Sequence, residues 1–205
     1  MAAIRAVTIS AFLRAEHTSH TEQFIVDALR ESGQLFVSLT ARLDGTVVGH
    51  VAISPASISD GATDWYGLGP LSVAPEYQRR GIGLRLVREA LSVLRGRAAS
   101  GCVLLGDPRY YNRFGFRVDP NLTLPGVPPD YFQTVAFGTI RPQGMVFYQP
   151  SISQQRLDSL WQIEDGVGKG SVAHGHVCKC PSMVPAARGN LSCYQRSTKA
   201  LVIPK

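Results

Sequence analysis

The segment LSVAPEYQRRGIG, residues 71–83, carries the residue types best suited to chemistry in this chain. An apolar stretch typical of a strand ends in a loop with two arginines and two glycines, and a helix follows at once. The first turn of a helix presents free backbone N–H groups and a partial positive charge, which together bind anions. Glycine lets a ligand approach the backbone closely, and arginine attracts phosphate. A lone G-x-G also fits a plain strand-to-helix turn, so we treat a phosphorylated ligand, such as a pyrophosphate, as a hypothesis.

Two other phosphate-binding motifs do not fit the sequence. The dinucleotide motif G-x-G-x-x-G requires a small residue at position 86, where the chain has Leu86. The segment GVGKGS, residues 166–171, lacks the P-loop spacing because Gly170 separates Lys169 from Ser171. We therefore exclude both motifs.

The elements that position the loop follow from hydrophobic periodicity. We expect helices near 1–15, 21–33 and 83–97, strands at 34–43, 46–55, 65–73 and 102–105, a short helix or turn at 108–115, and further strands up to residue 150. The helix between strands 65–73 and 102–105 implies a parallel crossover in a mainly antiparallel sheet. The expected fold class is α/β (α+β), with one mixed sheet flanked by helices.

Single residues refine these elements. In helix 21–33 we expect one buried face, made of Phe24, Ile25, Ala28 and Leu29. In strand 65–73, the glycines and the proline at positions 67–70 predict a bulge or an unpaired edge near the strand end.

Two motifs at matching separation resemble the GNAT superfamily of N-acetyltransferases. The first is QRRGIG, residues 78–83, which fits the family signature Q/R-x-x-G-x-G/A. The second is GDPRYYNRFGF, residues 106–116, with a tyrosine four residues before Gly-Phe, which is especially similar to a branch of predicted bacterial N-acetyltransferases. The resemblance covers about residues 3–149 and implies the GNAT acyl-CoA N-acyltransferase fold. Members normally open with a strand before the first helix. No such strand is predicted before the helix at 1–15, so we expect an unpaired sheet edge.

The resemblance also implies a cofactor and site residues. In the family acetyl-CoA is the co-substrate, and its pyrophosphate would lie on Gln78, Arg79, Arg80, Gly81, Ile82 and Gly83. Its pantetheine arm would run beside Leu71, Ser72 and Val73, where a backbone N–H near Val73 would polarise the thioester carbonyl. Tyr111 occupies the family position of the general acid that protonates the leaving thiolate, and its neighbour Tyr110 is the alternative donor.

The general base and the acceptor stay open. Glu76, Asp107 and His50 are candidates for the base, but each also suits a solvated or structural role, and we assign none. Tyr131 and Phe132 fit either an acceptor pocket or the core. The expected reaction is acetyl transfer to a primary amine of a small molecule or peptide by direct attack. The alternative is a non-catalytic module of the same fold that senses acyl-CoA.

Composition divides the chain near residue 150. The net charge is +6, and every lysine lies after residue 150, together with three of the four cysteines. We expect one GNAT domain at 1–150 and a flexible C-terminal extension at 151–205. In the extension His174, His176, Cys178 and Cys180 alternate, but the paired-cysteine spacing of zinc sites is absent, and we predict no metal site.

Partners and compartment follow from the same features. The apolar runs are too short to span a membrane, and the N-terminus lacks the pattern of a signal peptide. Cysteines without a secretion signal favour a cytoplasmic protein. A modest basic charge does not require a nucleic-acid partner. An exposed edge strand would favour a homodimer.

Overall fold

The computed structural model describes residues 1–13, 20–139, 141–148 and 198–202. Its α-helices are α1 (Ala2–Phe12), α2 (Glu22–Glu31), α3 (Ile82–Gly96) and α4 (Pro108–Tyr111). Short 3-10 helices are η1 (Pro75–Tyr77), η2 (Asn112–Phe114) and η3 (Pro129–Tyr131). The strands are β1 (Val37–Leu43), β2 (Thr46–Ile58), β3 (Trp65–Val73), β4 (Gly101–Leu105), β5 (Leu122–Thr123), β6 (Phe132–Ala136), β7 (Gly144–Tyr148) and β8 (Thr198–Val202). The element order predicted for residues 1–148 is confirmed.

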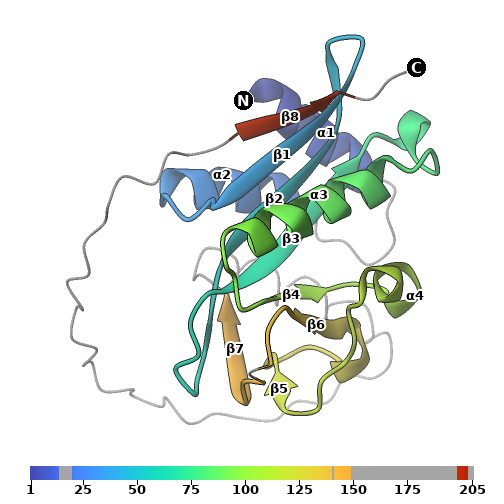
Figure 1. Ribbon diagram of the computed structural model, residues 1–205. Helices are drawn as coiled ribbons and strands as arrows, with labels where there is room; N and C mark the ends of the chain where they lie inside the picture. The colour runs from blue at the N-terminus through green and yellow to red at the C-terminus, as the bar shows by residue number, and fades with distance from the viewer. Residues whose placement is uncertain (14–19, 140, 149–197, 203–205) are drawn as a thin grey trace, which may run out of the picture.

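The strands form one mixed sheet. Its main path runs β5-β7-β2-β3-β4-β6, and β1 pairs with the first part of β2 while β7 pairs with its last three residues. The pair β3–β4 is parallel, as the helical crossover through α3 requires, whereas β1–β2, β2–β3 and β4–β6 are antiparallel. Figure 1 shows the long β2 and β3 ribbons crossing the centre of the molecule. The expected mixed, mostly antiparallel sheet is confirmed.

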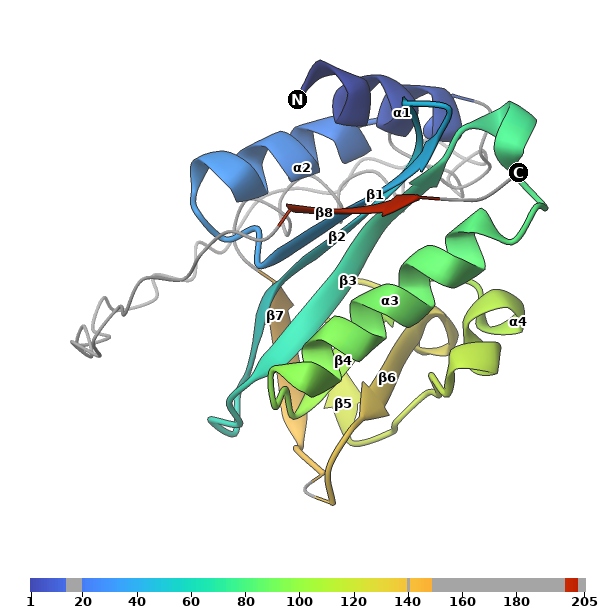
Figure 2. The ribbon, with the colours of Figure 1, turned by 45° about the horizontal axis from the view of Figure 1, so that its top comes forward.

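Helices cover both faces of the sheet. In Figure 2, α1 and α2 lie on one face and α3 lies on the other. The hydrophobic periodicity that predicted this helix is confirmed, because Val87, Leu91 and Leu94 are buried in the main core cluster and Leu84 is half-buried. In the part of the chain that the structure describes, no helix is both long enough and apolar enough to cross a membrane.

The buried face of α2 differs from the prediction chiefly at Phe24 and Val26. Ile25, Val26 and Leu29 are buried, whereas Phe24 is 44% exposed. The guanidinium of Arg5, on α1, lies 5.1 Å from the centre of the Phe24 ring. The helix is therefore rotated so that Val26 faces the sheet, and Phe24 gains a cation–π contact at the surface instead.

The sheet face beneath α1 and α2 carries a buried polar layer. Side chains of Ser38, Thr40, His50 and Ser72 lie there, and each is 6% exposed or less. The hydroxyl of Ser72 donates to that of Thr8 on α1 at 3.3 Å, which links the helix to the sheet. The alternating sequence of β1 is typical of a strand with one solvent-exposed face, but the helices on the two sides of the sheet bury both faces along most of this strand (Figure 2).

The edge of β1 is paired, which corrects the expected unpaired edge. Residues Thr198–Val202 form β8, which runs parallel to β1 in a register from Ser38↔Thr198 to Arg42↔Val202. Figure 1 shows β8, in red, beside β1 at the border of the sheet. The last residues of the predicted extension thus belong to the sheet of the main domain. A homodimer formed through a bare β1 edge is therefore no longer expected.

Candidate functional site

Strands β3 and β4 diverge at the centre of the sheet. They pair only over Trp65–Gly67 and Gly101–Val103, after which β3 continues beside β2 for six more residues, to Val73. The register between β2 and β3 shifts between Val51 and Ile53, opposite the Gly69-Pro70 peptide. This confirms the disturbed strand end predicted from the glycines and the proline. The side of β3 that faces β4 is thus left open beyond residue 67 in the described structure.

The hydrogen-bonding pattern gives the direction of the backbone groups on this open side. The N–H of Ala74 donates to the carbonyl of Val48 at 3.0 Å, so these residues form a hydrogen-bonded pair of the antiparallel ladder. Hydrogen-bonded and non-hydrogen-bonded pairs alternate along such a ladder. The N–H and C=O groups of Val73 and Leu71 therefore point away from β2, toward β4. Ser72 differs, because its backbone faces β2 and its side chain faces α1.

The loop after β3 is tied to the strand end. The side-chain amide of Gln78 donates to the Val73 carbonyl at 3.0 Å. Arg79 has a φ of +61°, a left-handed conformation that is uncommon for a residue with a side chain. The guanidinium of Arg80 lies 5.5 Å from the centre of the Tyr77 ring, which holds its charge beside the loop.

Helix α3 begins without a side-chain cap. Its N-cap is Gly81, and no side chain there accepts a hydrogen bond from the first turn. The N–H groups of this turn are directed toward the loop, and the helix dipole adds a partial positive charge. The predicted loop residues Gln78, Arg79, Arg80, Gly81, Ile82 and Gly83 therefore meet at an uncapped helix start, except that Ile82 is buried and offers only its backbone.

The two loop glycines are required for different reasons. Gly81 has a φ of +78°, which favours glycine, while nothing lies within 4 Å of the point where a Cβ would stand. Gly83 is different: the Tyr110 hydroxyl oxygen lies 2.7 Å from where a Cβ would stand. From the sequence alone, we predicted that both glycines let a ligand approach the backbone. In the structure, Gly83 makes room for a tyrosine of the same chain.

Tyr110 and Tyr111 point to different places. The Tyr110 hydroxyl reaches the first turn of α3 at Gly83, a position that Leu71 and Val73 also approach. The Tyr111 ring lies against the backbone of Gly106, where a Cβ would collide with it, and it packs edge-on against Phe116 with ring centres 6.1 Å apart. The two rings contact each other edge to face at 4.9 Å. Burial raises the pKa of Tyr110, so its hydroxyl is protonated at neutral pH.

The candidate bases have structural surroundings. His50 is fully buried, its Nε2 lies 2.9 Å from the Ser38 hydroxyl, and burial followed by the charge of Arg30 lowers its pKa to about 3. Asp107 caps α4 by accepting from the N–H of Arg109 at 2.8 Å, and its hydrogen bonds to Arg109 lower the pKa of its carboxyl. Glu76 is exposed on η1. A buried imidazole of low pKa is poorly suited to accept a proton from a substrate.

One residue near Tyr111 was missed by the sequence analysis. Gln133, on β6, is fully buried and donates from its side-chain amide to the Gly106 carbonyl at 2.8 Å. The Gly106 N–H donates to the Tyr131 carbonyl at 2.9 Å, so both polar groups of this glycine are held. A glutamine inside the apolar run YFQTVAF was the available signal. Of the two predicted acceptor residues, Phe132 is buried in the core and Tyr131 is 47% exposed.

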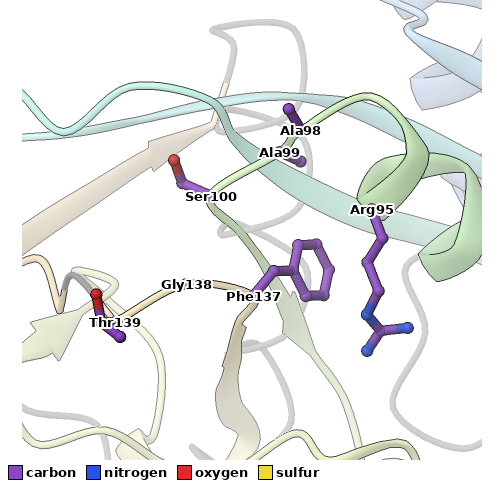
Figure 3. Close-up of a pocket in the computed structure, with 7 residues that line it drawn as sticks. All are labelled: Arg95, Ala98, Ala99, Ser100, Phe137, Gly138 and Thr139. Carbon is purple, nitrogen blue, oxygen red and sulfur yellow. The ribbon is translucent and has the colours of Figure 1, made fainter.

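A pocket of about 520 Å³ lies elsewhere, at the opposite end of α3. Figure 3 shows Phe137 and Arg95 side by side in it, with Ser100 and Thr139 on the neighbouring backbone. The Arg95 guanidinium is 4.7 Å from the centre of the Phe137 ring. The helix has 15 residues, so this pocket is about 20 Å from the loop at its start. It is therefore separate from the candidate site.

The alternating histidines and cysteines at 174–180 lie outside the described residues. Within those residues, no cluster of three or more histidines, cysteines or acids is arranged to hold a metal ion.

Comparison with known proteins connects this geometry to one family. Residues 1–116 match the family model described as Acetyltransferase (GNAT) family. A GNAT family acetyltransferase from Brucella melitensis, solved in complex with acetyl-CoA, is 48% identical, with 74% of this chain and 90% of that chain covered and a TM-score of 0.66. The N-acetyltransferase YhbS from Escherichia coli, solved in complex with CoA, is 32% identical, with 74% and 88% covered and a TM-score of 0.65. The uncharacterized N-acetyltransferase YhbS of strain K12 is 40% identical over 116 residues, 56% of this chain and 70% of that protein.

Proposed function

The chain belongs to the GNAT family of acetyltransferases, and from this premise we propose that it transfers an acetyl group from acetyl-CoA to a primary amine of a small molecule or peptide. The observation that carries the proposal is the open side of β3, which leads directly into the uncapped start of α3. A backbone edge suits an extended amide-containing arm, and a helix start suits a pyrophosphate. Relatives of the same fold were solved with acetyl-CoA or CoA bound, which supports this choice of ligand.

Each part of the site then has a role. The pyrophosphate would lie on the backbone of residues 78–83, with Arg80 beside it. The arm would follow Leu71 and Val73, whose N–H groups point away from β2. When bound, acetyl-CoA supplies the acetyl group as a reactive thioester. The N–H of Val73 would donate to the thioester carbonyl, and Tyr111 would give its proton to the departing sulfur.

A second function is favoured by the state of the candidate bases. His50 is buried, and Asp107 is engaged in capping α4. A domain that binds acyl-CoA without an effective base would act as a sensor rather than an enzyme. The two functions differ in whether CoA thiol is released when amines are added.

The first experiment is a calorimetric titration of the full chain with acetyl-CoA. We expect micromolar binding by the natural sequence and loss of binding in an Arg80→Glu, Gly81→Asp double variant, because both changes place negative charge at the helix start. Arg88→Glu is the control, since Arg88 is exposed further along α3 and this change reverses one charge as Arg80→Glu does. A folded natural protein that does not bind acetyl-CoA would overturn the proposal.

The second experiment separates enzyme from sensor. With a panel of amines, thiol release by the natural protein that falls at least tenfold in Tyr111→Phe, with unchanged acetyl-CoA affinity, supports catalysis with Tyr111 as the acid. Loss in Tyr110→Phe alone, measured at acetyl-CoA concentrations that saturate the variant, would move the acid to Tyr110. Binding without release for any amine would favour the sensor.

A further inference from the structure

The hydroxyl of Tyr110 stands out because the proposed function leaves it unused. It comes from α4, on the β4 side of the site, yet it reaches across to the first turn of α3, on the β3 side. It makes no hydrogen bond with the residues that the structure describes, while its ring has partners on several sides. A half-buried hydroxyl donor placed at a helix start, with the helix N–H groups beside it, is suited to an anionic acceptor.

A positive charge accompanies this hydroxyl. The guanidinium of Arg113 lies over the Tyr110 ring, 5.0 Å from its centre, and its Nη2 donates to the Arg109 carbonyl at 3.3 Å. Arg113 is exposed, and no carboxylate pairs with it among the described residues. The α4 side of the site therefore offers both a hydroxyl donor and a cation.

We propose that Tyr110 is a cofactor-binding residue, whose hydroxyl donates a hydrogen bond to an oxygen of the cofactor's pyrophosphate, with Arg113 beside it. The pyrophosphate would then be held from both sides, by the first turn of α3 and by α4. This role also explains why position 83 has no side chain, since any Cβ would displace the hydroxyl. The inference rests on the proposed function, because it requires a CoA thioester in this site.

The test measures the affinity of the full chain for three ligands. Acetyl-CoA and CoA contain the pyrophosphate, whereas acetyl-pantetheine contains only the arm and the thioester. We expect Tyr110→Phe to raise the Kd for acetyl-CoA and CoA roughly tenfold or more, because a hydrogen bond to a charged acceptor is lost. The Kd for acetyl-pantetheine should stay the same. Arg113→Gln should weaken binding of the same two ligands and reduce its dependence on salt.

Tyr111→Phe is the matched control, since it removes a hydroxyl from the adjacent ring and should leave all three affinities unchanged. Unchanged acetyl-CoA affinity in Tyr110→Phe would overturn the inference. An equal loss for acetyl-pantetheine would also overturn it, because the hydroxyl would then contact the arm. If the natural protein binds no acetyl-CoA, the proposed function fails and this inference fails with it. If only the variant results contradict expectation, the proposed function stands.

Discussion

The contact between Tyr110 and position 83 can be tested in the free protein by substituting Gly83 with alanine. Ordinary carbon–oxygen contacts begin near 3.4 Å, but the new Cβ would stand 2.7 Å from the Tyr110 hydroxyl oxygen. The next atoms are Val73 Cγ2 at 3.6 Å and Leu71 Cδ2 at 3.8 Å, so every ring carbon of Tyr110 is at least as far away. The hydroxyl is thus the one atom in the way, and Tyr110→Phe removes it.

Two opposing effects set the expected magnitude. Alanine in place of a helical glycine stabilises by up to about 1 kcal/mol. Forcing an atom into an occupied space costs about 1–3 kcal/mol. With Tyr110 present, Gly83→Ala should therefore lower the free energy of unfolding or leave it nearly unchanged. In the Tyr110→Phe background, the same substitution should raise it, which gives a coupling of about 1–3 kcal/mol between the two positions.

The assay is urea unfolding of the natural chain, the two single variants and the double variant. Gly96→Ala is the control, because Gly96 is in the same helix with nothing within 4 Å of its Cβ position. It should have the same effect whether position 110 holds tyrosine or phenylalanine. If Gly83→Ala changes stability equally in both backgrounds, the Tyr110 hydroxyl does not occupy this space and the account of position 83 is wrong.

Two further predictions concern the sheet. A chain ending at residue 197 lacks β8, so we expect faster amide exchange at residues 38–42 and a free energy of unfolding lower by about 1–2 kcal/mol than in a chain ending at residue 202. Equal exchange in the two chains would show that β8 does not protect β1. His50 has a folded-state pKa of about 3, below its ordinary 6.5, so it stays neutral in the folded chain while the unfolded chain takes up a proton. The free energy of unfolding should therefore fall between pH 6.5 and 5 by up to about 1.4 kcal/mol per unit, and His50→Gln should reduce this slope. An unchanged slope in the variant would contradict the burial of a neutral imidazole.

The order of the elements and the fold class could be predicted from the sequence, which also indicated the loop on which the candidate site is proposed. Hydrophobic periodicity was sufficient to predict α3, because its apolar residues recur at helical spacing on the face that packs against the sheet. The loop motif and the tyrosine motif were sufficient for the family, because two motifs at matching separation are much more specific than either motif alone. The glycines and the proline of β3 predicted its disturbed end, since these residues weaken a ladder wherever they occur.

Contacts between distant segments could be known only from the folded chain. Phe24 lies outside the buried face, where Arg5 from another helix contacts its ring. The β1 edge is paired because a segment more than 150 residues away lies beside it, and no local pattern encodes such a distant pairing. Gly83 looked like an opening for a ligand, yet the atom above it belongs to Tyr110. Spacing along the chain identifies which residue types are available, whereas the side chain that fills a given space is set by packing across the fold.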